Sequence, residues 1–305
     1  MKILKPSSIA ILLALQCLLP ALGMDSYPGR IQGNVKTFVD LQEPLSGAAK
    51  VFEVGAYKRP QSKPCPPVVF RAWLQKAHPE FFATANKYGP SSVIEVKGAW
   101  DDAARSLRAL NINHTSIRRG KLKDLDLIGA RVLVINCAGD VPRESLQKIR
   151  DFVVGGGYLL TTDWALDGCL QKAFPGYAEW NGGRTKSPIV DARLLDRQSA
   201  YANNTVSVAG WKLDDAAHTI RILKPGQVKV LAVSNELIAE DPDRAGVLAF
   251  TFPFGRGKVL HMIGHFDNNA AFIFTDSLPD PAPQIGIALR QALAANFIVE
   301  GLSHR

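Results

Sequence analysis

The sequence predicts an α/β protein built on a doubly wound, mostly parallel β-sheet. A near-continuous apolar run, Ala130–Cys137, is typical of a parallel strand that is covered on both faces. From Ser91 onward such β-type runs alternate with segments of helical periodicity, which favours strand–helix–strand units. Three consecutive glycines at residues 155–157 separate one helix from the next strand. Right-handed crossovers would place helices on both faces of this sheet.

The first strand–helix–strand unit is predicted over residues 92–118. Residues 92–97 form a β-type run, which Gly98 ends. Asp101 and Asp102 then begin a helix. Apolar residues recur there at helical spacing, namely Trp100, Ala104, Leu107 and Leu110. Residues 114–118 are predicted to form a short second strand.

A second unit begins with the apolar run at residues 130–137. Asp140 and Pro142 supply a cap and a first-turn proline for the helix that follows. The apolar side of this helix carries Leu146, Ile149 and Val153. Beyond the three glycines we expect a strand at residues 158–162 and another helix at residues 165–173.

The C-terminal half is predicted to combine further strands with one long helix. Residues 178–204 are polar and contain glycine, so we expect a long surface excursion there. Four strands are predicted after it, at residues 219–223, 228–234, 247–252 and 259–264. An amphipathic pattern predicts a helix over Gln284–Ile298.

The first 23 residues are predicted to be an export signal. Two lysines near the start precede an apolar run at residues 9–19, and the small residues Ala21 and Gly23 fit cleavage before Met24. The run holds about 11 residues, whereas a membrane-spanning helix needs about 20. An uncleaved anchor is the alternative. We expect a periplasmic or secreted protein with no membrane span in the mature chain.

The predicted organisation has three parts: the signal at residues 1–23, an N-terminal extension at residues 24–90, and an α/β domain at residues 91–305. The extension lacks a clear period and contains a proline-rich stretch, residues 60–67, which favours an extended path. Short helices are expected at residues 69–77 and 79–88.

Charge and cysteine content exclude some classes of function. The formal net charge of +8 is a mild excess, and the densest basic run, residues 118–123, lacks the interleaved aromatic residues of a nucleic-acid platform. Beyond Cys17 in the predicted signal, the chain has Cys65, Cys137 and Cys169. These are too sparse for a disulfide framework and lack metal-ligand spacing. The sequence leaves open whether Cys137 and Cys169 form a disulfide bridge.

Two short motifs place reactive residues directly after predicted strands. The first runs through Val-Ile-Asn-Cys-Ala-Gly, Phe-Val-Val-Gly-Gly-Gly and Tyr-Leu-Leu-Thr-Thr-Asp-Trp-Ala, between residues 126 and 176. The second is Val-Leu-His-Met-Ile-Gly-His-Phe-Asp at residues 259–267. Their order resembles the class I glutamine amidotransferase-like superfamily, including its ThuA-like and other non-glutaminase branches. The resemblance extends over about residues 91–300 and implies a flavodoxin-like fold.

The resemblance also implies a set of site residues. Asp163 falls at the position of the family's nucleophilic cysteine, His265 at that of the base, and Asp267 at that of the orienting carboxylate. Glutamine hydrolysis needs a thiolate that attacks the amide carbon, and a carboxylate is a far weaker nucleophile. Cys137 is expected inside the preceding strand and Cys169 beyond the turn, so neither substitutes. Glutaminase activity is therefore not expected.

Three uses of the matched residues remain open at this point. Asp163 can simply cap the following helix, with His265 an ordinary histidine at a sheet edge. Asp163 and His265 can instead serve a hydrolase that passes through an ester intermediate. Metal binding by His261, His265, Asp267 and Asp163 is the third use. It is weakened because His261 and His265, four apart on a strand, would lie about 13 Å from each other.

We predict an exported, non-catalytic domain that binds an unidentified ligand or protein partner at the carboxyl ends of its strands. Trp164 is the candidate floor of a ligand pocket, with core packing as the alternative, and Asn268 is a candidate ligand contact or turn residue. No cofactor, metal or nucleic acid is predicted. The alternative function is a hydrolase that uses Asp163 with His265 and Asp267. A structural envelope protein is a third possibility.

Overall fold

The structure is a computed structural model of the chain. It describes residues 31–32, 37–40, 50–53, 58–59, 63–65, 75, 79–186, 189–195, 201, 208–213, 216–240, 246–266, 272–274 and 286–304. The predicted export signal lies outside these residues, as do Asp267 and Asn268 and most of the predicted helix at residues 69–77.

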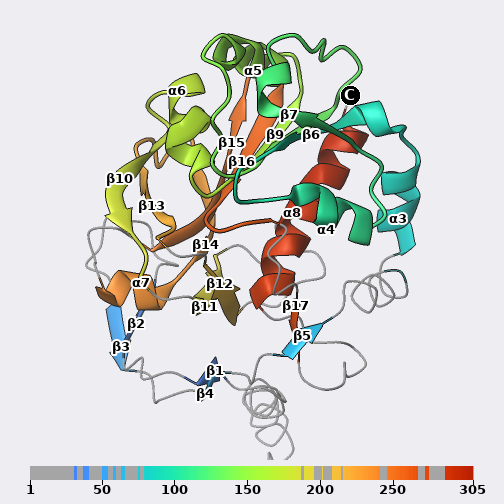
Figure 1. Cartoon of the computed structure of the whole chain (residues 1–305). Helices are drawn as coiled ribbons and strands as arrows, with labels where there is room; N and C mark the ends of the chain where they lie inside the picture. The colour runs from blue at the N-terminus through green and yellow to red at the C-terminus, as the bar shows by residue number, and fades with distance from the viewer. Residues whose placement is uncertain are drawn as a thin grey trace, which may run out of the picture.

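A nine-stranded sheet forms the centre of the described part of the chain (Figure 1). Its strands, in spatial order, are β12 (Val208–Lys212), β11 (Ile189–Leu194), β14 (Lys229–Val233), β15 (Val247–Phe254), β16 (Gly257–Met262), β9 (Tyr158–Thr162), β8 (Val132–Ile135), β6 (Val93–Lys97) and β7 (Thr115–Arg118). Neighbouring strands from β16 to β7 are parallel, and those from β12 to β16 are antiparallel. The predicted α/β fold class is confirmed.

Helices cover both faces of the parallel half of the sheet. The connection from β6 to β7 carries α4 (Ala103–Ala109), and that from β8 to β9 carries α5 (Ser145–Val154). Because these crossovers advance in opposite directions along the sheet, right-handedness places α4 and α5 on opposite faces. The long C-terminal helix α8 (Gly286–Ser303, Figure 1) contacts α3 (Pro79–Asn86), and Gln291 of α8 donates to Ser106 Oγ of α4 at 3.4 Å. α6 (Gln171–Ala173) contacts α5.

The remaining described elements are short. The chain turns through a π-helical segment, η3 (Leu166–Leu170), before α6, and α7 (Asn235–Glu240) follows β14. Four small two-stranded sheets pair β10 (Ala178–Arg184) with β13 (His218–Ile222), β1 (Ile31–Gln32) with β4 (Lys58–Arg59), β2 (Thr37–Asp40) with β3 (Lys50–Glu53), and β5 (Lys63–Cys65) with β17 (Phe272–Phe274). None of the described helices is long and apolar enough to cross a membrane.

The surface excursion predicted at residues 178–204 is wrong, because β10 and β11 lie within it. β11 is a sheet strand even though it carries Asp191, whose carboxylate is buried. That carboxylate accepts hydrogen bonds from Ser234 Oγ and from the amides of Asn235 and Glu236. Because the buried carboxylate has these hydrogen-bond partners, a strand that carries a polar residue can lie within the core.

Two details of the predicted helices are also wrong. Asp140 does not cap α5, which begins at Ser145, and instead forms an exposed ion pair with Arg119 at 2.8 Å. Trp100 was expected on the apolar side of α4, yet its side chain is 66% exposed. Asp101 next to it is buried, and its carboxylate accepts hydrogen bonds from Thr162 and Phe266.

His261 is fully buried in β16. Its Nδ1 lies 2.9 Å from Thr161 Oγ1 on the neighbouring strand, and its ring packs against Phe250. Burial in these surroundings lowers the pKa of His261 from 6.5 to about 3, because the apolar core disfavours the charged imidazole. His261 is therefore a neutral core residue and takes no part in the site described below.

Acid should destabilise the fold through His261. Between pH 6.5 and about pH 3 the unfolded chain binds a proton at His261 that the folded chain excludes, so the free energy of unfolding falls as the pH falls. The slope contributed is at most about 1.4 kcal/mol per pH unit. Urea unfolding at pH 7 and pH 4.5 should show a smaller loss for the apolar double variant Thr161→Val, His261→Phe than for the original protein. An equal loss in both would contradict this role of His261.

Candidate functional site

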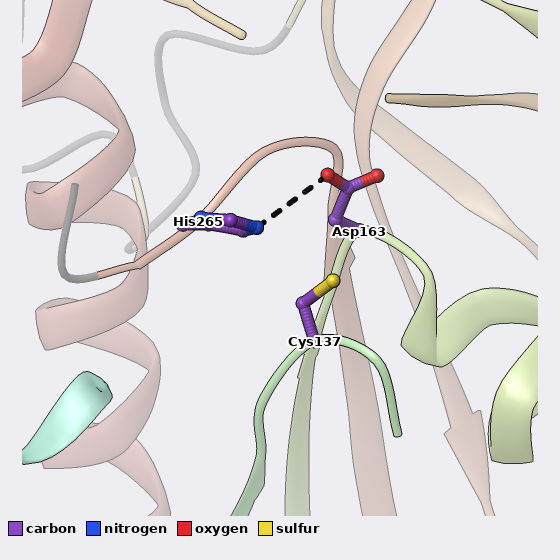
Figure 2. A group of neighbouring side chains, drawn as sticks. All are labelled: Cys137, Asp163 and His265. Carbon is purple, nitrogen blue, oxygen red and sulfur yellow. Dashed lines mark ion pairs between the residues drawn. The ribbon is translucent and has the colours of Figure 1, made fainter. Parts of the chain in front are cut away.

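Five parallel strands end at the same edge of the sheet, and reactive side chains follow three of them. β8 ends at Ile135, β9 at Thr162 and β16 at Met262, and β6 ends beside them at Lys97. Because carboxyl ends of parallel strands share an edge, the residues that follow them meet there. Figure 2 shows Cys137, Asp163 and His265 converging at this edge from three separate segments of the chain.

Asp163 occupies a sharp turn directly after β9. Its φ of 43° lies in the left-handed region, which few residues other than glycine adopt and aspartate tolerates better than most. Its amide donates to the carbonyl of Met262 at 2.8 Å, and its Oδ1 accepts from the amide of His218 at 3.1 Å. The side chain is only 2% exposed. The turn thus holds the carboxylate at the strand edge in one orientation.

His265 reaches Asp163 from the segment after β16. The chain bends at Gly264, whose φ is 73°, and this bend separates His265 from the line of β16. His265 Nε2 lies 3.8 Å from Asp163 Oδ2, and the histidine side chain is 12% exposed. That distance is an ion-pair contact when the imidazole is protonated and is too long for a direct hydrogen bond. The structure therefore brings Asp163 and His265 together.

Cys137 also belongs to this cluster, and the prediction that it lies inside a strand is wrong. β8 ends two residues earlier, and the sulfur of Cys137, a carboxylate oxygen of Asp163 and a ring nitrogen of His265 all lie within 4.8 Å of one another. The first residue after β8 is the polar Asn136, whose side-chain amide donates to the buried Glu95. That polar residue was the available sequence signal.

Asp101 links the three segments that carry the cluster. Its Oδ2 accepts from Thr162 Oγ1 at 2.6 Å and from the amide of Phe266 at 3.0 Å. Thr162 Oγ1 in turn accepts from the amide of Cys137 at 3.1 Å. Cys137 is thus hydrogen-bonded within this network, and Asp163 and His265 are next in the chain to Thr162 and Phe266, which also belong to it. Nothing in the sequence pattern pointed to Asp101, because its partners are distant along the chain.

The loop after Cys137 packs directly on the turn after Asp163. A Cβ at Gly139, whose φ is 72°, would lie 2.5 Å from the Cα of Ala165. A Cβ at Gly168 would lie 2.3 Å from the carbonyl oxygen of Ala138. Real Cβ atoms do not approach so closely, so glycine is required at both positions to keep the loop and the turn in contact.

Trp164 lies beside the cluster and is already engaged with protein groups. Its indole stacks on the ring of His218 with centroids 5.2 Å apart, and its Nε1 donates to the carbonyl of Ala216. Trp180 stacks on His218 at 4.1 Å. The Nδ1 of His218 lies 2.9 Å from Asp167 Oδ1. Whether Trp164 contacts a ligand stays a prediction.

Cys169 is separate from the cluster. It is fully buried, and burial raises the pKa of its thiol to about 12 because an apolar environment disfavours the thiolate. Cys137 and Cys169 are not joined in a disulfide. The bridge left open by the sequence does not form, and Cys169 serves as a small core residue.

A cavity of about 270 Å³ lies at the end of β6, and none of the three cluster residues is among the residues that line it. Residues 97–102 and Arg105 line it, so Asp101 borders both the cavity and the hydrogen-bond network. The amide of Trp100 donates to the carbonyl of Cys137, which ties the cavity wall to the cluster. Its lining carries two basic residues, Lys97 and Arg105, and two acidic ones, Asp101 and Asp102.

No protein-family model matches the chain, and no curated protein matches it in sequence. Solved structures that are similar in outline include the cytoplasmic protein STM3548 from Salmonella typhimurium, with 13% identity over 68% of this chain and 97% of that chain and a TM-score of 0.44. A putative GMP synthase protein from Thermoplasma acidophilum is 14% identical over 69% and 94%, with a TM-score of 0.45. The β-galactosidase from Bacillus circulans sp. alkalophilus is 14% identical over 68% and 31%, with a TM-score of 0.47. Likeness at this level is confined to the general α/β arrangement.

Proposed function

We propose that this chain is an exported, non-catalytic domain of the amidotransferase-like class that binds a ligand where its parallel strands end. The apolar segment at residues 9–19 supports export, and the two motifs around Asp163 and His265 support the class. The ligand site would comprise the cluster of Cys137, Asp163 and His265 and the cavity at the end of β6.

The observation that carries this proposal is the way Asp163 is held. One of its oxygens accepts the His218 amide, the other faces His265, and only 2% of the side chain is exposed. A nucleophile must be able to approach the atom that it attacks. A buried and fixed carboxylate is better suited to orienting a bound group than to attacking one.

A hydrolase is the second candidate, and a specific observation favours it. Asp163 occupies a strained turn after a strand, and His265 lies 3.8 Å away, within reach of one bridging water. In that mechanism Asp163, or a water activated by His265, would attack an ester or glycoside. Asp267 would orient His265, but it lies outside the described residues.

Binding and hydrolysis can be separated with the same variants. Purified, EDTA-treated protein would be tested for thermal stabilisation by acetate, L-glutamine, N-acetylglucosamine and AMP, and for hydrolysis of p-nitrophenyl acetate. A ligand at a hundred times its Kd adds about 2.7 kcal/mol of stability, which is a shift of several degrees for a domain. We expect at least one of these ligands to raise the unfolding temperature of the original protein. This shift should be absent in Asp163→Ala and present in Asp140→Ala, a control at an exposed residue.

Two results would contradict the proposal. Ester hydrolysis that is lost in both Asp163→Ala and His265→Ala, yet retained in Asp140→Ala, would establish the hydrolase instead. Thermal shifts that are identical in the original protein and Asp163→Ala would place ligand binding elsewhere.

Export is checked separately by N-terminal sequencing of the protein released from its host. The sequence of that protein should begin at Met24, and a retained Met1 would contradict export.

A further inference from the structure

We propose that Cys137, Asp163 and His265 bind a divalent transition-metal ion of the zinc type. This inference deepens the proposed function and rests on the same site, since it names the chemical class of one ligand. It depends on three donor groups that come from three different strand ends and meet at one point (Figure 2).

The spacing of the donor atoms suits one small ion. The three atoms lie within 4.8 Å of one another, and His265 Nε2 lies 3.8 Å from Asp163 Oδ2. In a tetrahedral zinc site with bonds of about 2.0–2.3 Å, neighbouring donor atoms lie about 3.4–3.6 Å apart. The donor pairs therefore need to contract by at most about 1.2–1.4 Å to enclose the ion.

The donor types select the kind of metal. A cysteine sulfur and an imidazole nitrogen are ligands for zinc and its transition-metal neighbours, whereas magnesium and calcium prefer sites made of oxygen. One carboxylate completes a set of three protein ligands. Structural zinc sites use four protein ligands, so a set of three leaves one coordination position for water or an exchangeable ligand.

The surroundings hold the donors in place before any ion binds. The amide of His218 fixes Asp163 Oδ1, which turns Oδ2 toward His265. Asp101 connects the backbone beside His265 with Thr162, the neighbour of Asp163, and Thr162 Oγ1 accepts from the Cys137 amide. Outer contacts of this kind orient metal ligands, and their loss commonly weakens affinity by about 10–100-fold.

Cobalt(II) offers a direct probe, because a cobalt–thiolate bond produces a charge-transfer absorption that other donors do not. Titrating the EDTA-treated protein with Co²⁺ should give this absorption with saturation at one equivalent, and added Zn²⁺ should remove it. Cys137→Ala should abolish it. Cys169→Ala is the matched control and should retain it, since that thiol is buried away from the cluster.

Further variants keep the test decisive if Cys137→Ala folds poorly. His265→Ala changes a partly exposed residue and should weaken Co²⁺ binding at least tenfold, as should Asp163→Asn, with folding confirmed by circular dichroism. Absence of the thiolate absorption in the original protein, or its persistence in Cys137→Ala, would overturn the metal site. Because the ligand panel above is run without metal, an Asp163-dependent thermal shift there would leave the proposed function standing if the metal inference fails.

Discussion

Replacing Gly139 with alanine is expected to lower the free energy of unfolding by about 2–5 kcal/mol, combining about 1–2 kcal/mol of left-handed backbone strain with about 1–3 kcal/mol of overpacking. Gly139 has a φ of 72°, and an added Cβ would lie 2.5 Å from the Cα of Ala165. To relieve this contact, the loop after Cys137 must move away from the turn after Asp163. The substitution should therefore also weaken Co²⁺ binding.

Gly226→Ala is the matched control for this experiment. A Cβ there meets no atom within 4 Å, and the residue does not have the positive φ that penalises alanine. Urea unfolding of both variants measures the difference in stability, and the cobalt titration measures the effect on the cluster. If Gly139→Ala were as stable as Gly226→Ala, the close packing of loop and turn would be refuted.

Replacing Trp211 with alanine should lower the free energy of unfolding by about 3–5 kcal/mol, the usual loss for removing a large core side chain. Trp211 in β12 is fully buried, and the guanidinium of Arg290 lies over its ring at 5.6 Å. Its Nε1 donates to the carbonyl of Ile263 at 3.0 Å. Because Ile263 is two residues before His265, the substitution should also loosen the segment that carries this histidine.

Trp211→Phe separates the volume of the side chain from its hydrogen bond. Phenylalanine keeps much of the buried ring but removes the donor, so it should lose clearly less stability than alanine. Urea unfolding of the two variants gives this comparison. Equal losses for Phe and Ala would mean that the bond to Ile263, rather than the buried volume, dominates at this position.

The arrangement of the parallel half could be predicted because its signals are local. The apolar run of β8 requires cover on both faces, and glycines 155–157 end α5 where the chain turns back into β9. β11 could not be predicted in the same way. Its buried Asp191 is stabilised by Ser234, 43 residues later, and no local pattern reveals such a partner.

The candidate site shows the same division. Asp163 and His265 could be placed at one edge because each follows a predicted strand, and parallel strands end together. Cys137 was missed because the predicted strand was extended across the polar Asn136, whereas β8 ends at Ile135. Asp101 was missed because its role depends on Thr162 and Phe266, which only the fold brings near.

Anomalous X-ray diffraction at the zinc absorption edge, from crystals of the protein grown with Zn²⁺, tests the central claim most directly. The claim is that Cys137, Asp163 and His265, which follow the ends of β8, β9 and β16, together bind a metal ion. We expect one strong anomalous peak about 2.0–2.3 Å from the cysteine sulfur, the carboxylate oxygen and the imidazole nitrogen. No peak at this position, or zinc bound only at other groups of the protein, would contradict it.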